Sequence, residues 1–544
     1  MTTLTLHLRR GLARLPGERG ALVLAALFAL LLPLATPRVY ATDEVQYYVY
    51  LRSLRFDGDL DFENDYRGFA ALNPRSGVAE SLLQPNRIRE RTGLYGNIAP
   101  VGAAIMWAPF FLLADALVHL ASAFGAQIPA DGFSAPYTRA VAYASALYGF
   151  LGVLLCYRLA RHYASQRASS LAAATAWLAT PLVWYMFVQM PFAHATGLFL
   201  TALFLTIWHE TRKAKGQTPS AKGEAAAALA PTTTTIAPQP QPTSNKGATS
   251  QDETFSVSES VRRSWSAWLA LGLVGGLMTI TREQLGLFLL APALEALLAY
   301  ASLSRRGAWR AAGGLLARHA LFVAAFLAAL APQLAAYQAL NGVPRPAGEV
   351  SSKLNWCSPH LVDTLVDYDP RPSAWCRVEG DFTAALRPFS RGAFVWSPAL
   401  VPALAGLALL WRRDRLLASA LALGFLAQTY VNGAFGTTWH LTGAFGFRRL
   451  IECTPAFTVG LALLADRLAA RVGWRWALLP ALLLVAWNAG LVVNASVFNA
   501  ETQLRQGLTW PDLWRWQLEA PFRLASRLGD LLFNRCVFLE NGRC

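Results

Sequence analysis

Apolar runs of about the length that crosses a bilayer recur along the chain, and they constrain its fold more than any other feature. They cover residues 20–36, 137–157, 168–184, 193–209, 265–280, 284–302, 319–337, 395–411, 416–431, 451–466 and 476–494. A helix of about 20 apolar residues spans the roughly 30 Å hydrocarbon core of a bilayer and satisfies its own backbone hydrogen bonds there. The sequence therefore predicts an all-α, polytopic helical bundle in a membrane.

Composition supports a membrane protein and argues against several soluble classes. The 544 residues are 54% hydrophobic and 15% charged, and their net charge is +15. The Arg residues lie in short clusters between the apolar runs and no basic-aromatic stretch typical of nucleic-acid binding occurs, so we expect no nucleic-acid partner. The motifs GxxxxGK[ST], HExxH and GxSxG are also missing, which leaves nucleotide hydrolysis, zinc proteolysis and serine hydrolysis without support.

One further apolar segment, residues 98–123, decides the topology. It contains Asp115 and His119 and is interrupted by Pro109, which suits an interfacial or re-entrant helix. If it does not cross, all positive clusters lie on the side of the N-terminus, as the positive-inside rule requires of cytoplasmic loops. These clusters are Arg158/Arg161/Arg167, Arg212/Lys213/Lys215, Arg305/Arg306/Arg310, Arg412/Arg413/Arg415 and Arg467/Arg471/Arg475. We expect about eleven spans plus this helix, with the N-terminus inside the cell and the C-terminus outside.

This topology divides the chain into two membrane modules. Residues 1–210 form an N-terminal module with a first periplasmic loop at 37–136, and residues 263–494 form a C-terminal module with a periplasmic loop at 338–394. Residues 211–262 are rich in Ala, Thr, Pro, Gln and Ser, which predicts a disordered cytoplasmic linker. Residues 495–544 are expected to form a periplasmic tail. The expected location is the bacterial inner membrane.

Four cysteines lie in segments that this topology places outside the cell. Disulfides form in oxidising compartments, and four cysteines allow three pairings. The simplest pairing joins Cys357 to Cys376 and Cys536 to Cys544, and four free thiols are the alternative.

An acidic and aromatic stretch, "YATDEVQYYVYLRSLRFDGDLDFENDY", follows the first apolar run. Asp43 and Glu44 stand at its start, where a carboxylate near apolar walls can have its pKa tuned for general-base catalysis. Alternatively, Thr42 or Asp43 only caps the helix that begins there, with acidic charge favourable in the first turn. The residues of this stretch alone leave both interpretations open.

The later part of the stretch, "DGDLDFEND", resembles both a DxD motif and a calcium loop. An EF-hand loop requires Gly at its sixth position and Glu at its twelfth, where this chain has Phe62 and Gly68. A DxD motif serves nucleotide sugars, which are cytosolic, whereas this loop is expected outside the cell. We favour a solvated turn over a cation site, and a divalent cation is the one cofactor that the sequence leaves open.

Other polar groups are expected at the external ends of the spans. "TREQ" and "FGTTWHLTGAFGFRRLIE" place positive charge at ends that otherwise lack it, and a guanidinium pair there can grip a lipid phosphate. The alternatives are a structural histidine, ordinary contact with phospholipid headgroups, and pairing of these arginines with Glu452. The candidate residues are Gln189, His194, Arg282, Glu283, His440, Arg448 and Arg449.

Taken together, these segments resemble the GT-C superfamily of integral-membrane glycosyltransferases. The likeness is to bacterial relatives of the protein O-mannosyltransferases and the lipid A aminoarabinose transferases. It rests on the first-loop stretch, on "PFSRGAFVWSPAL" and "GAFGFRRLIECTP", and on the hydropathy pattern over most of residues 20 to 494. The segment 211–262 departs from the common pattern, and the first loop contains no Lys to match the one near the active site of aminoarabinose transferases.

The resemblance implies transfer of a sugar from a polyprenyl phosphate to a glycan, lipid or protein acceptor on the external face, with inversion at the anomeric carbon. Asp43 matches the family's catalytic aspartate and Glu44 its acidic neighbour, which would orient the site. On physical grounds, Arg448, Arg449 and Arg282 are expected to bind the donor phosphate, because cations stabilise the charge that develops on a leaving group. We expect His194, Gln189, His440 and Glu283 to contact substrate.

Two other functions are compatible with a polytopic bundle. An O-antigen ligase-like transferase would use a large late external loop and would not depend on Asp43. A transporter or flippase of lipid-linked sugar would carry polar residues at mid-bilayer and inverted repeats. The spans have few ionisable residues at their centres and no obvious repeat, which favours the glycosyltransferase.

Overall fold

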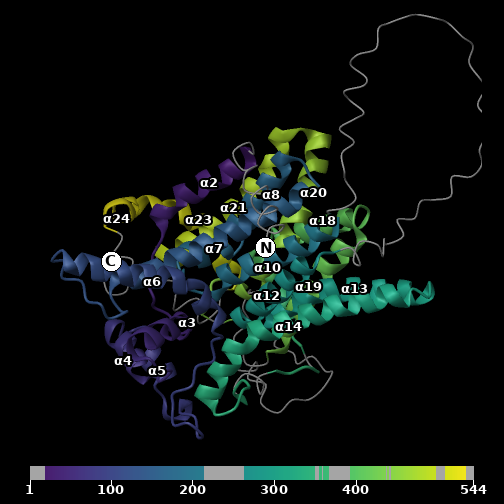
Figure 1. The fold of residues 1–544 in the computed structure, drawn as a ribbon. Helices are drawn as coiled ribbons and strands as arrows, with labels where there is room; N and C mark the ends of the chain where they lie inside the picture. The colour runs from purple at the N-terminus through teal and green to yellow at the C-terminus, as the bar shows by residue number, and fades with distance from the viewer. Residues whose placement is uncertain are drawn as a thin grey trace, which may run out of the picture.

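The computed structural model describes residues 19–213, 263–348, 354–357, 359–366, 392–435, 438–439, 441, 443–497 and 509–534. These residues form helices and their connections, with two isolated β-bridges, Ile88 to Tyr95 and Leu354 to Phe435. The prediction of an all-α bundle is confirmed (Figure 1). Most of the expected linker, 214–262, lies outside the described residues.

The first half of the chain supplies one apolar helix, a folded first loop and four longer helices. They are α2 (Arg19–Leu31), η2 (Leu32–Leu34), α3 (Thr42–Arg52), η3 (Ser53–Asp57), α4 (Glu63–Leu72), α5 (Val78–Leu82), η4 (Pro85–Arg87), α6 (Gly102–Ala123), α7 (Ala135–Arg161), α8 (Gln166–Leu178), α9 (Leu182–Phe187) and α10 (Ala193–Lys213).

The second half adds the helices that complete the bundle. They are α12 (Trp265–Thr281), η5 (Glu283–Leu289), α13 (Leu290–Arg305), α14 (Trp309–Asn341), α16 (Leu361–Leu365), α17 (Ala393–Trp396), α18 (Leu400–Trp411), α19 (Arg415–Ala434), η7 (Arg448–Cys453), α20 (Thr454–Val472), α21 (Trp474–Val497), α23 (Trp510–Ser526) and α24 (Leu528–Phe533).

Each apolar run predicted as a span lies mainly on helix, although the run 395–411 is interrupted at 397–399 between α17 and α18. By length and composition, seven helical segments in the described chain are able to cross a membrane, and three shorter apolar helices accompany them. The run 168–184 is divided into α8 and α9 at Thr180 and Pro181, because proline has no N–H to continue the helical ladder. These segments make the chain a multi-pass membrane protein.

Helix α6 follows only the first half of α7. The Tyr148 hydroxyl donates to the Met106 carbonyl at 3.0 Å, and the Tyr137 hydroxyl donates to Asp115 at 2.8 Å. The two helices are therefore antiparallel, and α6 runs from the middle of α7 back towards its N-terminal end. There Asp115 also accepts from Arg55 of the first loop at 2.9 Å. This course supports a helix that returns to the face of the first loop, although α6 is also long and apolar enough to span.

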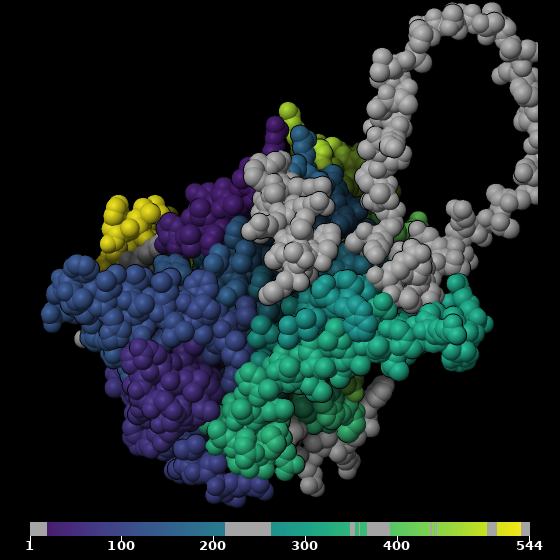
Figure 2. Space-filling model, viewed as in Figure 1, coloured from purple at the N-terminus to yellow at the C-terminus, as the bar shows by residue number. Residues whose placement is uncertain are grey.

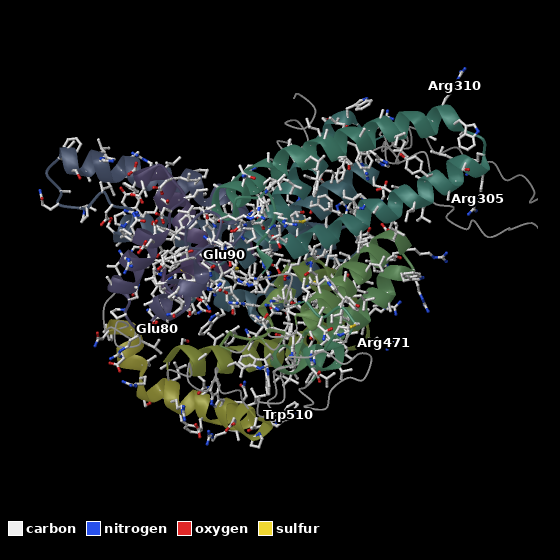
Figure 3. All side chains as sticks on the ribbon, turned by 90° about the horizontal axis from the view of Figure 1, so that it is seen from below. Glu80, Glu90, Arg305, Arg310, Arg471 and Trp510 are labelled. Carbon is white, nitrogen blue, oxygen red and sulfur yellow. The ribbon has the colours of Figure 1, made fainter. Side chains whose placement is uncertain are left out.

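The positive clusters gather at one end of the bundle, which we call the arginine-rich end. Arg212 pairs with Asp414 there, and Arg158 pairs with Glu210 at 3.2 Å. The Ser165 backbone N–H donates to Asp466 at 2.7 Å, which joins α8 to α20. Figure 3 shows Arg305, Arg310 and Arg471 on one side of the molecule, and Glu80 and Glu90 of the first loop on the other.

Close packing of α12 on α14 follows from the small-residue spacing in "GLVGG". A Cβ added to Gly276 would lie 2.6 Å from the Ala329 Cβ and 2.7 Å from the Phe326 carbonyl oxygen. Gly272 likewise faces the backbone at Phe322. Because glycine has no side chain, the two helices approach closely along this line.

A Gly276→Ala variant is expected to unfold more easily, because its methyl group would meet backbone of the adjacent helix. Overpacking of this kind costs roughly 1–3 kcal/mol. Gly313→Ala is the matched control, since no atom lies within 4 Å of an added Cβ in α14 there. The thermal unfolding midpoint in detergent should fall for Gly276→Ala and hold or rise for Gly313→Ala. Equal midpoints would contradict the packing.

Candidate functional site

The site lies at the end of the bundle opposite the arginine-rich end, where the first loop meets η7. Asp43 stands in the first turn of α3, and its side chain is 37% exposed. Its Oδ2 accepts a hydrogen bond from the Arg448 guanidinium at 2.6 Å. The ion pair thus joins residues 405 positions apart in the sequence.

Arg448 is held by aromatic groups as well as by Asp43. Its guanidinium lies over the Phe192 ring at 4.9 Å, and the Tyr185 hydroxyl also interacts with it. A cation over an aromatic face is attracted by the ring quadrupole. The guanidinium is therefore fixed from two sides, and its side chain stays 19% exposed for further contacts.

Glu44 points away from Asp43 and back to the start of its own helix. Its Oε2 accepts from the Tyr40 N–H at 2.6 Å and from the Ala41 N–H at 3.0 Å. The cap expected from Thr42 or Asp43 is thus made by Glu44. Burial raises the pKa of Glu44 from its ordinary 4.5 to about 8.

A buried triad lies one helical turn below Arg448. Arg282 Nη1 donates to His194 Nδ1 at 2.7 Å and also to Glu452 Oε1. All three side chains are at most 10% exposed, and they come from α10, the end of α12 and η7. His194 Nδ1 also lies 3.2 Å from Glu452 Oε1. It therefore either accepts from Arg282, with the ring proton on Nε2, or carries the proton itself and donates to Glu452. The Glu452 carboxylate pairs with Arg282 and lies 3.2 Å from His194 Nδ1, so the alternative that Arg448 or Arg449 pairs with it is wrong.

Arg449 turns to the opposite side from Arg448. It donates to the Thr438 carbonyl at 3.2 Å and to the Thr438 hydroxyl at 3.1 Å, and it lies over the Phe435 ring at 4.4 Å. It still interacts electrostatically with Arg448 and Arg282. The adjacent guanidinium groups therefore diverge from one backbone segment while their charges act on the same region.

The remaining predicted residues lie outside this central group. Gln189 accepts a hydrogen bond from the Trp184 indole at 2.9 Å, and Glu283 accepts one from Tyr337. Within the described residues, neither side chain forms a hydrogen bond or ion pair with Asp43 or Arg448. The prediction for His440 falls outside the described residues.

Carboxylates of the "DGDLDFEND" turn bond to the loop itself. Asp57 and Asp65 both pair with Arg52, and Glu63 pairs with Arg67 at 2.6 Å. Within the described ranges, no group of three His, Cys, Asp or Glu side chains is placed to hold a metal ion. The turn therefore uses these charges to hold its own fold, and Asp65 is fully buried. The preference for a solvated turn over a cation site stays a prediction.

Cys357 is disulfide-bonded, while Cys156 and Cys453 are buried free thiols. The cysteine expected to pair with it, Cys376, lies outside the described residues, as do Cys536 and Cys544.

Two residues of the site were not singled out from the sequence as site residues. Glu452 follows Arg448 by four positions, and Tyr47 follows Asp43 by four, which places each pair on one helical face. The Tyr47 ring packs edge-on against Trp107, whose indole donates to Thr196 close to His194. Burial raises the pKa of Tyr47 to about 12, and Arg282, Asp43 and Arg448 all act on it. The helical spacing was the available signal for both residues.

Comparisons with known proteins give similarity in structure without similarity in sequence. No protein-family model and no curated protein matches the chain. The structure of ArnT from Cupriavidus metallidurans bound to undecaprenyl phosphate aligns with a TM-score of 0.45 and 14% identity, over 95% of this chain and 77% of that one. The archaeal oligosaccharyltransferase AglB from Archaeoglobus fulgidus, in complex with an inhibitory peptide and a dolichol-phosphate, aligns with a TM-score of 0.43 and 14% identity, over 91% of this chain and 56% of that one.

At 14% identity and TM-scores below 0.5, these matches carry no residue roles or substrates over to this chain. The roles below rest on its own geometry.

A Glu44→Gln variant is expected to change how stability depends on pH. The raised pKa means that the folded state holds the Glu44 proton more tightly than the unfolded state. The contribution of Glu44 to the stability of the wild type should therefore be fully present below about pH 4.5 and be lost as pH rises through about 8. Glutamine stays neutral and its amide oxygen can accept the same two N–H groups.

The measurement is the unfolding midpoint in detergent between pH 5 and 8.5. The decline with pH should be shallower for Glu44→Gln than for wild type, and the variant should be the more stable at the alkaline end. Parallel curves for the two proteins would show that Glu44 is not the titrating group.

Proposed function

We propose that this chain is an inverting glycosyltransferase of the GT-C type. It takes a sugar from a polyprenyl-phosphate donor and passes it to a glycan, lipid or protein acceptor of the cell envelope. The reaction would occur at the periplasmic face of the inner membrane. The observation that carries this proposal is the meeting of Asp43, Arg448 and the buried Arg282 triad at one end of an apolar bundle.

Asp43 supplies the general base. In an inverting transfer, the acceptor hydroxyl attacks the anomeric carbon while the bond from that carbon to the phosphate oxygen breaks. The acceptor proton passes to the Asp43 carboxylate, and the polyprenyl phosphate leaves with the electron pair. Asp43 suits this role because its carboxylate is partly exposed, whereas Glu44 is buried and bonds to backbone. Glu44 positions Asp43 by fixing the first turn of α3.

The arginines stabilise the leaving phosphate. Arg448 uses one N–H on Asp43, which leaves other donors of its guanidinium for a phosphate beside the base. Arg282 commits Nη1 to His194 and Glu452 and retains Nε and Nη2. Guanidinium groups bind phosphate oxygens bidentately, and fixed cations are most effective where negative charge develops. Arg449 adds positive charge from the Thr438 side.

His194 contributes a neutral hydrogen-bond donor. When Nδ1 accepts from Arg282, the Nε2–H is the group that this ring offers to a sugar or phosphate oxygen. Gln189, Glu283 and His440 remain proposed substrate contacts. Metal dependence is no part of this mechanism.

A buried ion pair joins Arg263 to Glu295, which lies near the middle of the apolar segment Glu283–Arg305, and other buried pairs lie at the two ends of the bundle. Paired charges occur at the site end, as Arg282 with Glu452, and at the arginine-rich end, as Arg212 with Asp414. A transporter is expected to place such groups near mid-bilayer, at the interface of repeats.

The test is transfer of radiolabelled sugar from polyprenyl phosphate to envelope material, using purified protein in liposomes and a panel of donor sugars. Asp43→Asn should lower the transfer rate by about 10²-fold or more, since a general base contributes roughly 10² to 10⁴. Asp61→Asn is the matched control, because Asp61 Oδ1 accepts only the Glu63 N–H in the exposed turn. Binding of undecaprenyl phosphate should be retained by both variants.

Equal transfer by Asp43→Asn and wild type would remove Asp43 from the chemistry. Transfer by the wild type from diphosphate-linked oligosaccharide alone would favour the O-antigen ligase-like transferase. Protein-dependent movement of lipid-linked sugar across the bilayer without transfer would favour the transporter.

A further inference from the structure

Helix α23 has three distinct faces, and only one of them packs on the bundle. Leu513, Trp516 and Ala520 are buried against α21. Successive residues of an α-helix are rotated by about 100° around the helix axis. On this geometry, charged residues form the face beside the buried one, and exposed apolar residues form the third face. The charged face holds Asp512, Arg515, Glu519 and Arg523. The exposed face holds Trp510, Trp514, Leu518 and Phe522, which are 44%, 55%, 71% and 79% exposed.

The exposed face continues onto α24. Leu528, Leu532 and Phe533 are 50%, 63% and 87% exposed there. Figure 1 shows α23 beside α21 with α24 continuing from it, and Figure 2 shows α24 standing at the surface. Two successive helices thus present large apolar side chains that no described part of the chain covers.

This face is continuous with a membrane-spanning helix. Asn494 of α21 donates to the Trp516 carbonyl at 2.9 Å, and Gln517 donates to the Trp487 carbonyl at 2.8 Å. The Trp487 and Trp514 rings meet edge to face with their centroids 5.3 Å apart. Because α21 is apolar and mostly unburied, its outer surface is a lipid-facing one. Trp514 therefore packs beside the middle of α21 and Trp516 beside its last turn, so the exposed face of α23 is continuous with that surface.

The composition and charge of α23 and α24 indicate what covers their exposed apolar face. Tryptophan is enriched at membrane–water interfaces, and an amphipathic helix can lie there with its apolar side in the acyl boundary. The charges beside the face balance one another: Arg515 pairs with Asp512 at 3.2 Å, and Arg527 pairs with Asp530 at 2.8 Å. Arg523 pairs in turn with Glu519. A charged protein partner would find no net charge to recognise.

We propose that α23 and α24 lie in the membrane interface, with Trp510, Trp514, Leu518 and Phe522 inserted into the leaflet on the Asp43 side. The part of residues 495–544 that forms these helices is then bound to the lipid surface and is not a free periplasmic tail. This role is independent of the proposed sugar transfer. It would keep the C-terminal segment on the leaflet at the end of the bundle that carries the site.

The test places one fluorescent label at a time on two adjacent faces of α23. Leu518→Cys and Glu519→Cys are made in full-length protein whose Cys536 and Cys544 are serine, labelled with bimane and reconstituted into phosphatidylcholine–phosphatidylglycerol nanodiscs. Quenching by lipids brominated on the acyl chains reports burial in the membrane, and quenching by aqueous iodide reports exposure to water. Unsubstituted background protein corrects for other labelling.

The label at 518 should be quenched at least twofold more by brominated lipid than the label at 519, and iodide should give the reverse order. Phe522→Cys provides a second label on the same face if Leu518→Cys folds poorly. Equal iodide quenching of 518 and 519 would overturn the proposal. Protection of 518 from both quenchers would also overturn it, because another protein surface would then cover the face.

Discussion

The ion pair between Asp43 and Arg448 is the interaction on which the site depends. It fixes the first loop against η7, at 2.6 Å and across 405 positions of sequence. Glu44 secures the helix end that presents Asp43, and Phe192 secures the guanidinium. Without this contact, the proposed base and the proposed phosphate-binding groups would belong to separate parts of the molecule.

Burial explains why Arg282, His194 and Glu452 lie together below Arg448. A charge in a low-dielectric interior is costly unless it is paired and hydrogen-bonded. Glu452 Oε1 meets this requirement through Arg282, and His194 Nδ1 lies 2.7 Å from the same Arg282 nitrogen. The triad therefore holds Arg282 in one orientation below Arg448, and the apolar spans around it keep water out. The same rule accounts for the pairing of Arg212 with Asp414 at the other end.

The helices could be predicted from the sequence because span length and apolar runs are local properties, and each expected run lies mainly on helix. The division of the run 168–184 at Pro181 and the short return of α6 along α7 depend on packing, so the sequence predicted them only in part. Asp43 and Arg448 were each predicted for their chemistry, but their contact is long-range. The inward turn of Glu44, the divergence of Arg449 and the pairing of Arg282 with Glu452 are decided by which partner each side chain meets after folding, which no local pattern contains.

A double-mutant cycle on the rate of sugar transfer tests most directly whether Asp43 and Arg448 work as one unit. The four proteins are wild type, Asp43→Asn, Arg448→Gln and the double variant, each compared at saturating donor. Residues that act together are strongly non-additive. The double variant should therefore lose no more activity than the more damaged single variant. Losses that multiply would show that the two residues act independently, which would contradict a site built on their ion pair.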